Sequence, residues 1–207
     1  MQKSSNRVSA FTLIELLVVI GIIIILAGLL YPAFQAVQNQ AKRTQAKNDL
    51  TQIVTAVNAY YTEYGKYPIA AADTIYGPGG APTNDDLFYT LRAVDAGANG
   101  GNVANPRKIV FISPPYVKNP ADPRSGIGTT TGAGQYYDPW GTPYAIEIDG
   151  NYDNQLVNPY ALNAGATPLQ LGVIGWSFGK DAQSDSVPGP AADKNTSPND
   201  DDVISWQ

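Results

Sequence analysis

The 207-residue sequence contains no histidine and no cysteine. These absences exclude imidazole and thiolate metal ligands, Ser-His-Asp and Cys-His nucleophile systems, and any disulfide framework. Only 15% of the residues are charged, and 18 acidic against 13 basic side chains give a net charge of -5. Because a broad basic surface is therefore missing, we expect no nucleic-acid partner. The length fits one ordinary domain with an appended element.

The amino-terminal region holds a long apolar run. Residues 13–30 contain a single charge, and residues 11–34 would span about 36 Å as a helix. A helix that is apolar on every face is buried in a large protein or inserted in a membrane, and the rest of this chain is too small to bury it. A cleaved secretory signal is a rival, because Lys3 and Arg7 precede the run. The run is longer than such a signal, however, and no small-x-small site closes it.

Glu15 is the single charge within this run. An ionised carboxylate at that depth costs about 2 to 3 kcal/mol unless a partner neutralises it. No Lys or Arg lies between Thr12 and Ala41. The carboxyl must therefore find a partner from elsewhere, stay protonated, or reach the membrane interface.

Residues 11–34 resemble the amino terminus of type IV pilins and of type II secretion pseudopilins. The features that carry the resemblance are a short basic leader, then Phe11, Thr12, Leu13, Glu15 in fifth place after the leader, and Pro32 within the helix. The resemblance implies that a prepilin peptidase cuts between Ala10 and Phe11, on the cytoplasmic side, and that Phe11 is then N-methylated. Ala10 stands where the family usually has glycine. The resemblance also implies that Glu15 pairs with the Phe11 amine of a neighbouring subunit and so specifies the subunit stagger.

Apolar residues continue at helical spacing after the membrane segment, at positions 37, 50, 53, 54, 57, 60, 61 and 64. Gly65 and Pro68 predict the helix end. We therefore expect one nearly continuous helix from Phe11 to Tyr64, with a kink or a locally melted turn at Pro32. The helix end YYTEYGKYP and the later DPWG sequence also resemble the major pseudopilin of type II secretion.

The predicted fold is α+β and pilin-like, with a small antiparallel sheet on the second half of the helix. We expect a leader at 1–10, a transmembrane and assembly half of the helix at 11–34, an amphipathic half at 35–65, and a globular domain at 66–207. Three strands are predicted, at 107–113, at 143–148 with clear alternation, and at 171–178. A short helix at 85–94 is expected to be capped by Asn84 or Asp85.

Acidic residues gather near the carboxyl end, at Asp181, Asp185, Asp200, Asp201 and Asp202. An all-oxygen ligand set in flexible loops suits calcium, and the alternative is a solvated acidic tail. The pattern of Ser177, Gly179, Asp181, Asp202, Val203 and Trp206 resembles the carboxyl end of major pseudopilins. That resemblance implies a calcium ion held by Asp181 and Asp202, with Asp200 as a further candidate and backbone carbonyls near Phe178. The segment 185–198 is longer than in the family.

The resemblance implies a structural subunit rather than an enzyme, namely the major pseudopilin of type II secretion. Such a subunit would cross the bacterial inner membrane once, with a cytoplasmic amino terminus, and assemble into a periplasmic helical homo-oligomer. Its implied partners are a prepilin peptidase, an inner-membrane assembly platform and minor pseudopilins. One alternative is a type IV pilus subunit for adhesion, motility or DNA uptake, which usually carries a disulfide loop. Another is a membrane-anchored carbohydrate-active domain, although its acids show no evident cleft.

Overall fold

The computed structural model describes residues 12–78, 82–183 and 189–207. The chain divides into two compact units, Met1–Ala41 and Lys42–Gln207, and we call the second the globular unit. Helix α1 (Leu13–Tyr64) contributes to both units. The predicted long helix is confirmed from Leu13 onward, and Phe11 lies outside the described residues.

Helix α1 ends where the sequence predicted. Gly65 adopts a left-handed φ of 68°, and its N–H donates to the carbonyl oxygen of Tyr61 at 2.8 Å. This is a glycine helix end, which a residue with a Cβ would adopt only under strain. At Pro32 the helix continues, so the expected locally melted turn is absent.

The central sheet has four antiparallel strands in the order β1-β4-β6-β8. The strands are β1 (Thr74–Tyr76), β4 (Ala145–Ile148), β6 (Val173–Ser177) and β8 (Val203–Ile204). The predicted α+β class is confirmed, with a small antiparallel sheet beside the long helix. Strands β4 and β6 match two predicted strands, whereas β1 and β8 were not predicted.

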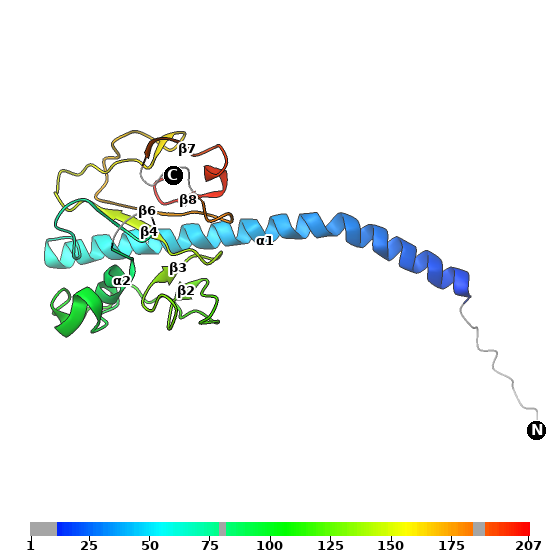
Figure 1. Cartoon of the computed structure of the whole chain (residues 1–207), viewed down its shortest axis with the longest axis horizontal. Helices are drawn as coiled ribbons and strands as arrows, with labels where there is room; N and C mark the ends of the chain where they lie inside the picture. Colours follow the sequence, from blue (N-terminus) through cyan, green and yellow to red (C-terminus); the bar gives the residue numbers. More distant parts are fainter. Residues whose placement is uncertain (1–11, 79–81, 184–188) are drawn as a thin grey trace, which may run out of the picture. The chain divides into compact units, whose positions relative to one another are not determined.

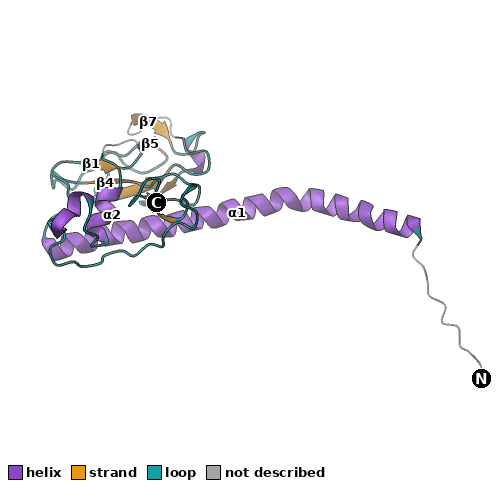
Figure 2. Cartoon of the chain, turned by 60° about the horizontal axis from the view of Figure 1, so that its bottom comes forward, coloured by secondary structure: helices purple, strands orange, loops and turns teal. Residues whose placement is uncertain are grey.

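Shorter elements surround this sheet. They are α2 (Asp85–Leu91), the 3-10 helices η1 (Gly97–Asn102) and η2 (Asn199–Asp201), the antiparallel pair β2 (Gly126–Ile127) and β3 (Tyr136–Tyr137), and the parallel pair β5 (Tyr160–Leu162) and β7 (Gly189–Asp193). Figures 1 and 2 show β5 and β7 on the side of the central sheet away from α1.

Both faces of the central sheet are covered. Leu50, Ile53 and Val57 of α1 share one buried cluster with Ile146 and Ile148 of β4. A second cluster contains alternate residues of the central strands together with residues of β5, β7 and the connecting loops: Ala145, Leu156, Tyr160, Ala164, Leu169, Ile174, Trp176, Phe178, Ala192 and Ile204. The sheet is therefore the middle layer of the globular unit, and α1 covers only one side of it.

The second layer also covers the polar position of strand β4. All four residues of β4 are buried, and Glu147 is only 4% exposed. Its neighbours in register are Ile75 of β1 and Ile174 of β6. The polar residue therefore points into a covered face rather than into water.

The strand predicted at residues 107–113 is wrong, because this segment pairs with no strand among the described residues. The N–H groups of Phe111 and Ile112 instead donate to the carbonyl oxygen of Leu91, at 2.8 and 3.4 Å, at the end of α2. The Phe111 ring packs edge-on against Tyr60 at 5.3 Å. The apolar residues of this segment thus close the end of α2 and cover α1 without forming a ladder.

The cap of α2 also differs from expectation. Asn84 is the residue before the helix, but its side chain makes no capping hydrogen bond. The fully buried amide instead donates to the carbonyl oxygens of Tyr136 and Tyr144 and accepts from the Tyr136 N–H. Asn84 therefore ties α2 to the segment entering β4.

Candidate functional site

The first candidate site is the apolar part of α1 within the amino-terminal unit. An 18-residue window there has a mean hydropathy of 3.1, and none of it is buried. The side chains are widely exposed, with Leu13 at 81% and Leu29 at 70%. A contiguous apolar surface of this size marks a membrane or a protein interface. Its length and composition are consistent with membrane anchoring.

Glu15 lies in the first turn of α1. Its Oε2 accepts hydrogen bonds from the Thr12 N–H at 2.8 Å and the Thr12 hydroxyl at 2.7 Å, while the Glu15 N–H donates to the Thr12 hydroxyl at 3.3 Å. This reciprocal arrangement is a capping box, which satisfies donors at the helix start. Thr12 is thus the partner of the Glu15 carboxylate among the described residues of a single chain.

The other residues predicted for processing and assembly are Ala10, Phe11 and Pro32. The processing pair Ala10 and Phe11 lies outside the described residues. Pro32 lies inside α1, and the helix accommodates it without ending. Proline removes one backbone donor in a helix interior, so the turn around Pro32 is held by one hydrogen bond fewer than its neighbours.

The second candidate site is the acidic carboxyl-terminal region, with Asp202 at its centre. Asp202 is 3% exposed, and its Oδ2 accepts a 2.6 Å hydrogen bond from the Tyr160 hydroxyl. No described residue pairs with its Oδ1. Burial raises the pKa of Asp202 to about 7, although the Tyr160 bond and Lys194 act in the opposite direction.

Asp201, rather than Asp200, joins the neighbouring loop. Its Oδ2 accepts from the Lys180 N–H at 2.5 Å and the Asp181 N–H at 3.1 Å, and its Oδ1 is buried without a described partner. The side chains of Asp200 and Asp181 are exposed, and Asp181 Oδ1 accepts from the Gln183 N–H. The predicted ligands therefore lie in the same region, with only Asp202 buried.

The fit of this region to calcium is partial. Two buried carboxylate oxygens, on Asp201 and Asp202, have no partner among the described residues, and a hard cation is a suitable partner for such oxygens. No group of three or more acidic side chains converges to hold a metal ion within residues 12–78, 82–183 and 189–207. Asp185 lies outside these ranges. Backbone or water oxygens would have to supply the remaining ligands.

Two cations of α1 hold the carboxyl-terminal segment in place. Lys47 Nζ donates to the carbonyl oxygens of Ile204 at 2.7 Å, Ser205 at 3.2 Å and Gln207. Arg43 Nη2 donates to the Asp200 carbonyl oxygen at 2.5 Å. The acidic region is thus fixed to the helix of its own globular unit as well as to β6.

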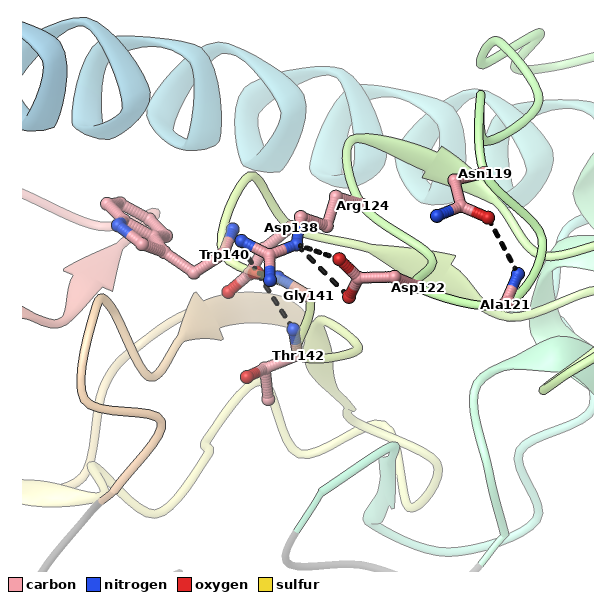
Figure 3. Close-up of polar contacts among 8 residues, drawn as sticks. All are labelled: Asn119, Ala121, Asp122, Arg124, Asp138, Trp140, Gly141 and Thr142. Atoms are coloured by element: carbon pink, nitrogen blue, oxygen red, sulfur yellow. Dashed lines mark hydrogen bonds and ion pairs between the residues drawn. The ribbon is translucent and has the colours of Figure 1, made fainter.

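The predicted DPWG turn contacts the end of β6, which leads into the acidic region. Asp138 is fully buried, and its Oδ1 accepts from the N–H groups of Trp140, Gly141 and Thr142 at 2.8 to 3.0 Å (Figure 3). Its Oδ2 accepts a 2.5 Å bond from the Ser177 hydroxyl at the end of β6. Burial raises the pKa of Asp138 despite these bonds. Asp138 therefore locks the turn to the strand that leads into the acidic loop.

Sequence reasoning missed Tyr160 and the two α1 cations as supports of the acidic region. The Tyr160–Asp202 contact joins residues 42 positions apart, and Lys47 reaches residues more than 150 positions away. No local pattern marks such pairs. The one available signal was the position of Arg43 and Lys47 one helical turn apart, on a helix expected to contact the globular domain.

Comparison with known proteins gives a partial match. Residues 5–31 match the family described as "Prokaryotic N-terminal methylation motif". The chain is 36% identical over 78 residues to "Type IV major pilin protein PilA" of Myxococcus xanthus, covering 38% of this chain and 36% of the relative. It is 43% identical over 60 residues to "Type II secretion system core protein G" of Pseudomonas aeruginosa, covering 29% of this chain and 42% of the relative.

A third relative, "Type IV major alpha-pilin" of Moraxella bovis, is 39% identical over 69 residues, covering 33% of this chain and 43% of the relative. The chain thus spans less than half the length of these three relatives. No solved structure matches it. The matched names include both pilins and a secretion protein, so they do not separate these two kinds of filament. The methylation motif and this homology support a type IV pilin-like protein, similar to both pilins and pseudopilins.

Proposed function

We propose that the chain is a structural subunit of the periplasmic pseudopilus of a type II secretion system. The observation that carries this proposal is the exposed apolar part of α1, most of which lies within a prepilin-type methylation motif. An isolated helix of this kind is stable only in lipid or against copies of itself. Before assembly the subunit would reside in the inner membrane with its amino terminus in the cytoplasm. It would then be incorporated into a helical filament.

The choice of a secretion pseudopilus over a pilus rests on two features. The chain has no cysteine, whereas the resemblance to type IV pili implies a carboxyl-terminal disulfide loop. Its carboxyl end also follows the acidic pseudopilin pattern. The type IV pilus subunit stays the second candidate, since two of the relatives described above are pilins.

In the proposed filament, Glu15 exchanges one partner for another. In a single chain its carboxylate accepts from the Thr12 hydroxyl and N–H. After a prepilin peptidase removes residues 1–10, the new Phe11 amine of a neighbouring copy would supply a cation for it. A charge pair in a low-dielectric interface adds little net stability, but it strongly penalises any register that leaves one charge alone.

Processing and assembly can be tested together on the full chain. We expect intact-mass spectrometry after coexpression with a prepilin peptidase to give a chain that begins at an N-methylated Phe11. Coexpression with the assembly platform and minor pseudopilins of a secretion system should then give fibres in electron micrographs. A chain that keeps residues 1–10 in its native host would refute the proposal. Fibres formed only with pilus assembly proteins would replace it with the second candidate.

We also propose that calcium binds the carboxyl-terminal region through Asp202 and Asp181, with Asp200 nearby and Asp201 as an additional donor. The support is the buried, unpartnered Oδ1 atoms of Asp201 and Asp202. When bound, the ion would neutralise this acidic region and hold the loop after β6 against the segment that leads into β8.

A melting experiment on the detergent-solubilised full chain tests the calcium proposal. Binding only to the folded state adds about 2.7 kcal/mol at a hundredfold excess over Kd, so calcium should raise the melting temperature relative to chelator. Asp202→Asn should abolish that difference. Asp153→Asn is the matched control, because it removes an exposed acid outside the region and should keep the difference. Identical melting temperatures of the parent chain with calcium and with chelator would refute calcium binding.

A further inference from the structure

The globular unit has a basic pocket that neither the pilin-like fold nor the acidic region explains. It is an open hollow of about 400 Å³ beside the DPWG turn. Its polar lining includes Lys42, Lys118, Asn119, Asp122 and Arg124. Three cations therefore face one acid in a chain whose net charge is -5. This local excess of positive charge contrasts with the negative net charge of the protein.

The cations of the basic pocket are available to an external anion. Among the described residues, no hydrogen bond or ion pair engages the ammonium group of Lys42 or Lys118. Toward the part of the chain that the structure describes, Arg124 uses only its Nε, which donates to the two carboxylate oxygens of Asp122 at 3.1 and 3.2 Å (Figure 3). The other four N–H donors of a guanidinium remain for a ligand, in the fork geometry that suits phosphate.

Two further groups complete this lining. The Asn119 side-chain oxygen accepts from the Ala121 N–H at 3.1 Å, which fixes the amide and leaves its NH₂ group as a donor. Tyr116 forms part of the wall, and the Arg92 guanidinium lies 5.0 Å from the centre of its ring while donating to its hydroxyl at 2.9 Å. A fourth cation thus contacts a lining residue and adds to the positive potential.

The sequence position of Lys42, which lines the basic pocket, indicates the source of the anion. Lys42 is the first residue of the globular unit and follows Phe34, at the end of the apolar segment, by eight residues. Along a helix that separation is about 12 Å. Lipid headgroups extend about 5 to 7 Å beyond the hydrocarbon core, and the long lysine stem covers the remaining gap. Lys42, one of the cations that line the basic pocket, is therefore close along the chain to the proposed membrane segment.

We propose that the basic pocket binds the phosphate of an anionic phospholipid headgroup and so holds the globular unit at the membrane surface before assembly. This inference rests on the membrane anchoring in the proposed function. Lys42, Lys118 and Arg124 supply the attraction, and Asp122 weakens it by competing for Arg124. Extraction of the subunit into a filament would break these headgroup contacts.

Native mass spectrometry of the detergent-solubilised full chain tests the proposal with phosphatidylglycerol and phosphatidylcholine as probes. We expect preferential adducts with phosphatidylglycerol. One basic residue near an anionic lipid is worth about a fivefold change in affinity, so the double variant Lys118→Gln/Arg124→Gln should weaken binding about thirtyfold. The variant Asp122→Asn should strengthen it about fivefold. All three side chains are exposed, so the fold should tolerate these changes.

The matched control is Lys66→Gln/Lys108→Gln, which removes two exposed cations that do not line the basic pocket. We expect it to keep the phosphatidylglycerol adducts. Equal losses in both double variants, or no loss in either, would overturn the proposal. Displacement of the lipid by millimolar inorganic phosphate would also overturn it, in favour of a free phosphate ligand.

Carbonate extraction of native membranes separates this inference from the proposed function. A chain that stays in the membrane pellet but shows no lipid preference refutes only the headgroup site. A chain released by carbonate refutes membrane anchoring, and the headgroup site with it.

Discussion

Replacing Glu147 with glutamine should raise the free energy of unfolding of the globular unit by about 3 kcal/mol at pH 8. Glu147 is 4% exposed, and its Oε2 has no partner among the described residues. Burial, followed by the nearby charge of Asp73, raises the pKa of its carboxyl from 4.5 to about 7. Glutamine keeps the shape of the side chain but cannot ionise.

The raised pKa of Glu147 determines how the free energy of unfolding changes with pH. Below about pH 4.5 the carboxyl is neutral in both the folded and the unfolded chain, so Glu147 carries no ionisation penalty. Between that pH and about 7 the unfolded chain ionises first, and stability falls as the pH rises. A difference of about 2.5 pKa units corresponds to about 3 kcal/mol. Above pH 7 the penalty is constant.

Urea unfolding of the full chain in detergent, followed by tryptophan fluorescence, measures this effect, because all three Trp residues belong to the globular unit. The gain from Glu147→Gln should be near zero at pH 4 and complete by pH 8. Glu63→Gln is the control, since it removes an ion pair with Arg107 at the surface and should change stability by less than about 1 kcal/mol. An equal gain from Glu147→Gln at both pH values would refute the reasoning.

Three other predictions concern packing and polar contacts. Trp176→Ala should lower the unfolding free energy by about 3 to 5 kcal/mol in urea titrations followed by circular dichroism, because Trp176 is fully buried in the second cluster. Asp138→Ala should cost about 3 kcal/mol in the same assay, since it leaves buried donors of the turn unpaired. Lys47→Met should speed carboxypeptidase trimming about tenfold by releasing the terminal carbonyls.

The long helix was predictable because its signals are local. An uninterrupted apolar run, helical spacing and Gly65 each act within a few residues, so the bounds near Leu13 and Tyr64 follow from the sequence. The same holds for the DPWG turn, whose Asp138 binds N–H groups two to four positions away. Local physical chemistry was sufficient for these elements.

The rest depends on contacts between distant segments. Strands β1 and β8 have only three and two residues, too few to show a period, and they exist because β4 and β6 offer them edges. The segment 107–113 has an apolar pattern like a strand, but the end of α2 uses it instead. The burial of Glu147 follows from a second layer over the sheet, which no single segment reveals.

For the carboxyl-terminal acids, too, the sequence predicted the region but not the contacts of each side chain. Composition predicted an acidic region, and the structure places Asp202 in a buried pair with Tyr160. Sequence could not show that Asp201 turns toward the loop while Asp200 faces outward, because that choice is made by η2 and by the N–H groups of Lys180 and Asp181. Tertiary geometry thus decides which carboxylates a cation would meet.

The central claim is that Glu15 acts in assembly rather than in membrane insertion, and one substitution tests it most directly. Glu15→Leu removes the only charge of the apolar run, so the chain should still reach the membrane fraction in full amount. The filament fraction sheared from cells should fall to background, while Glu63→Gln, in the amphipathic half of α1, should keep it. Normal filament yield from Glu15→Leu would contradict the account.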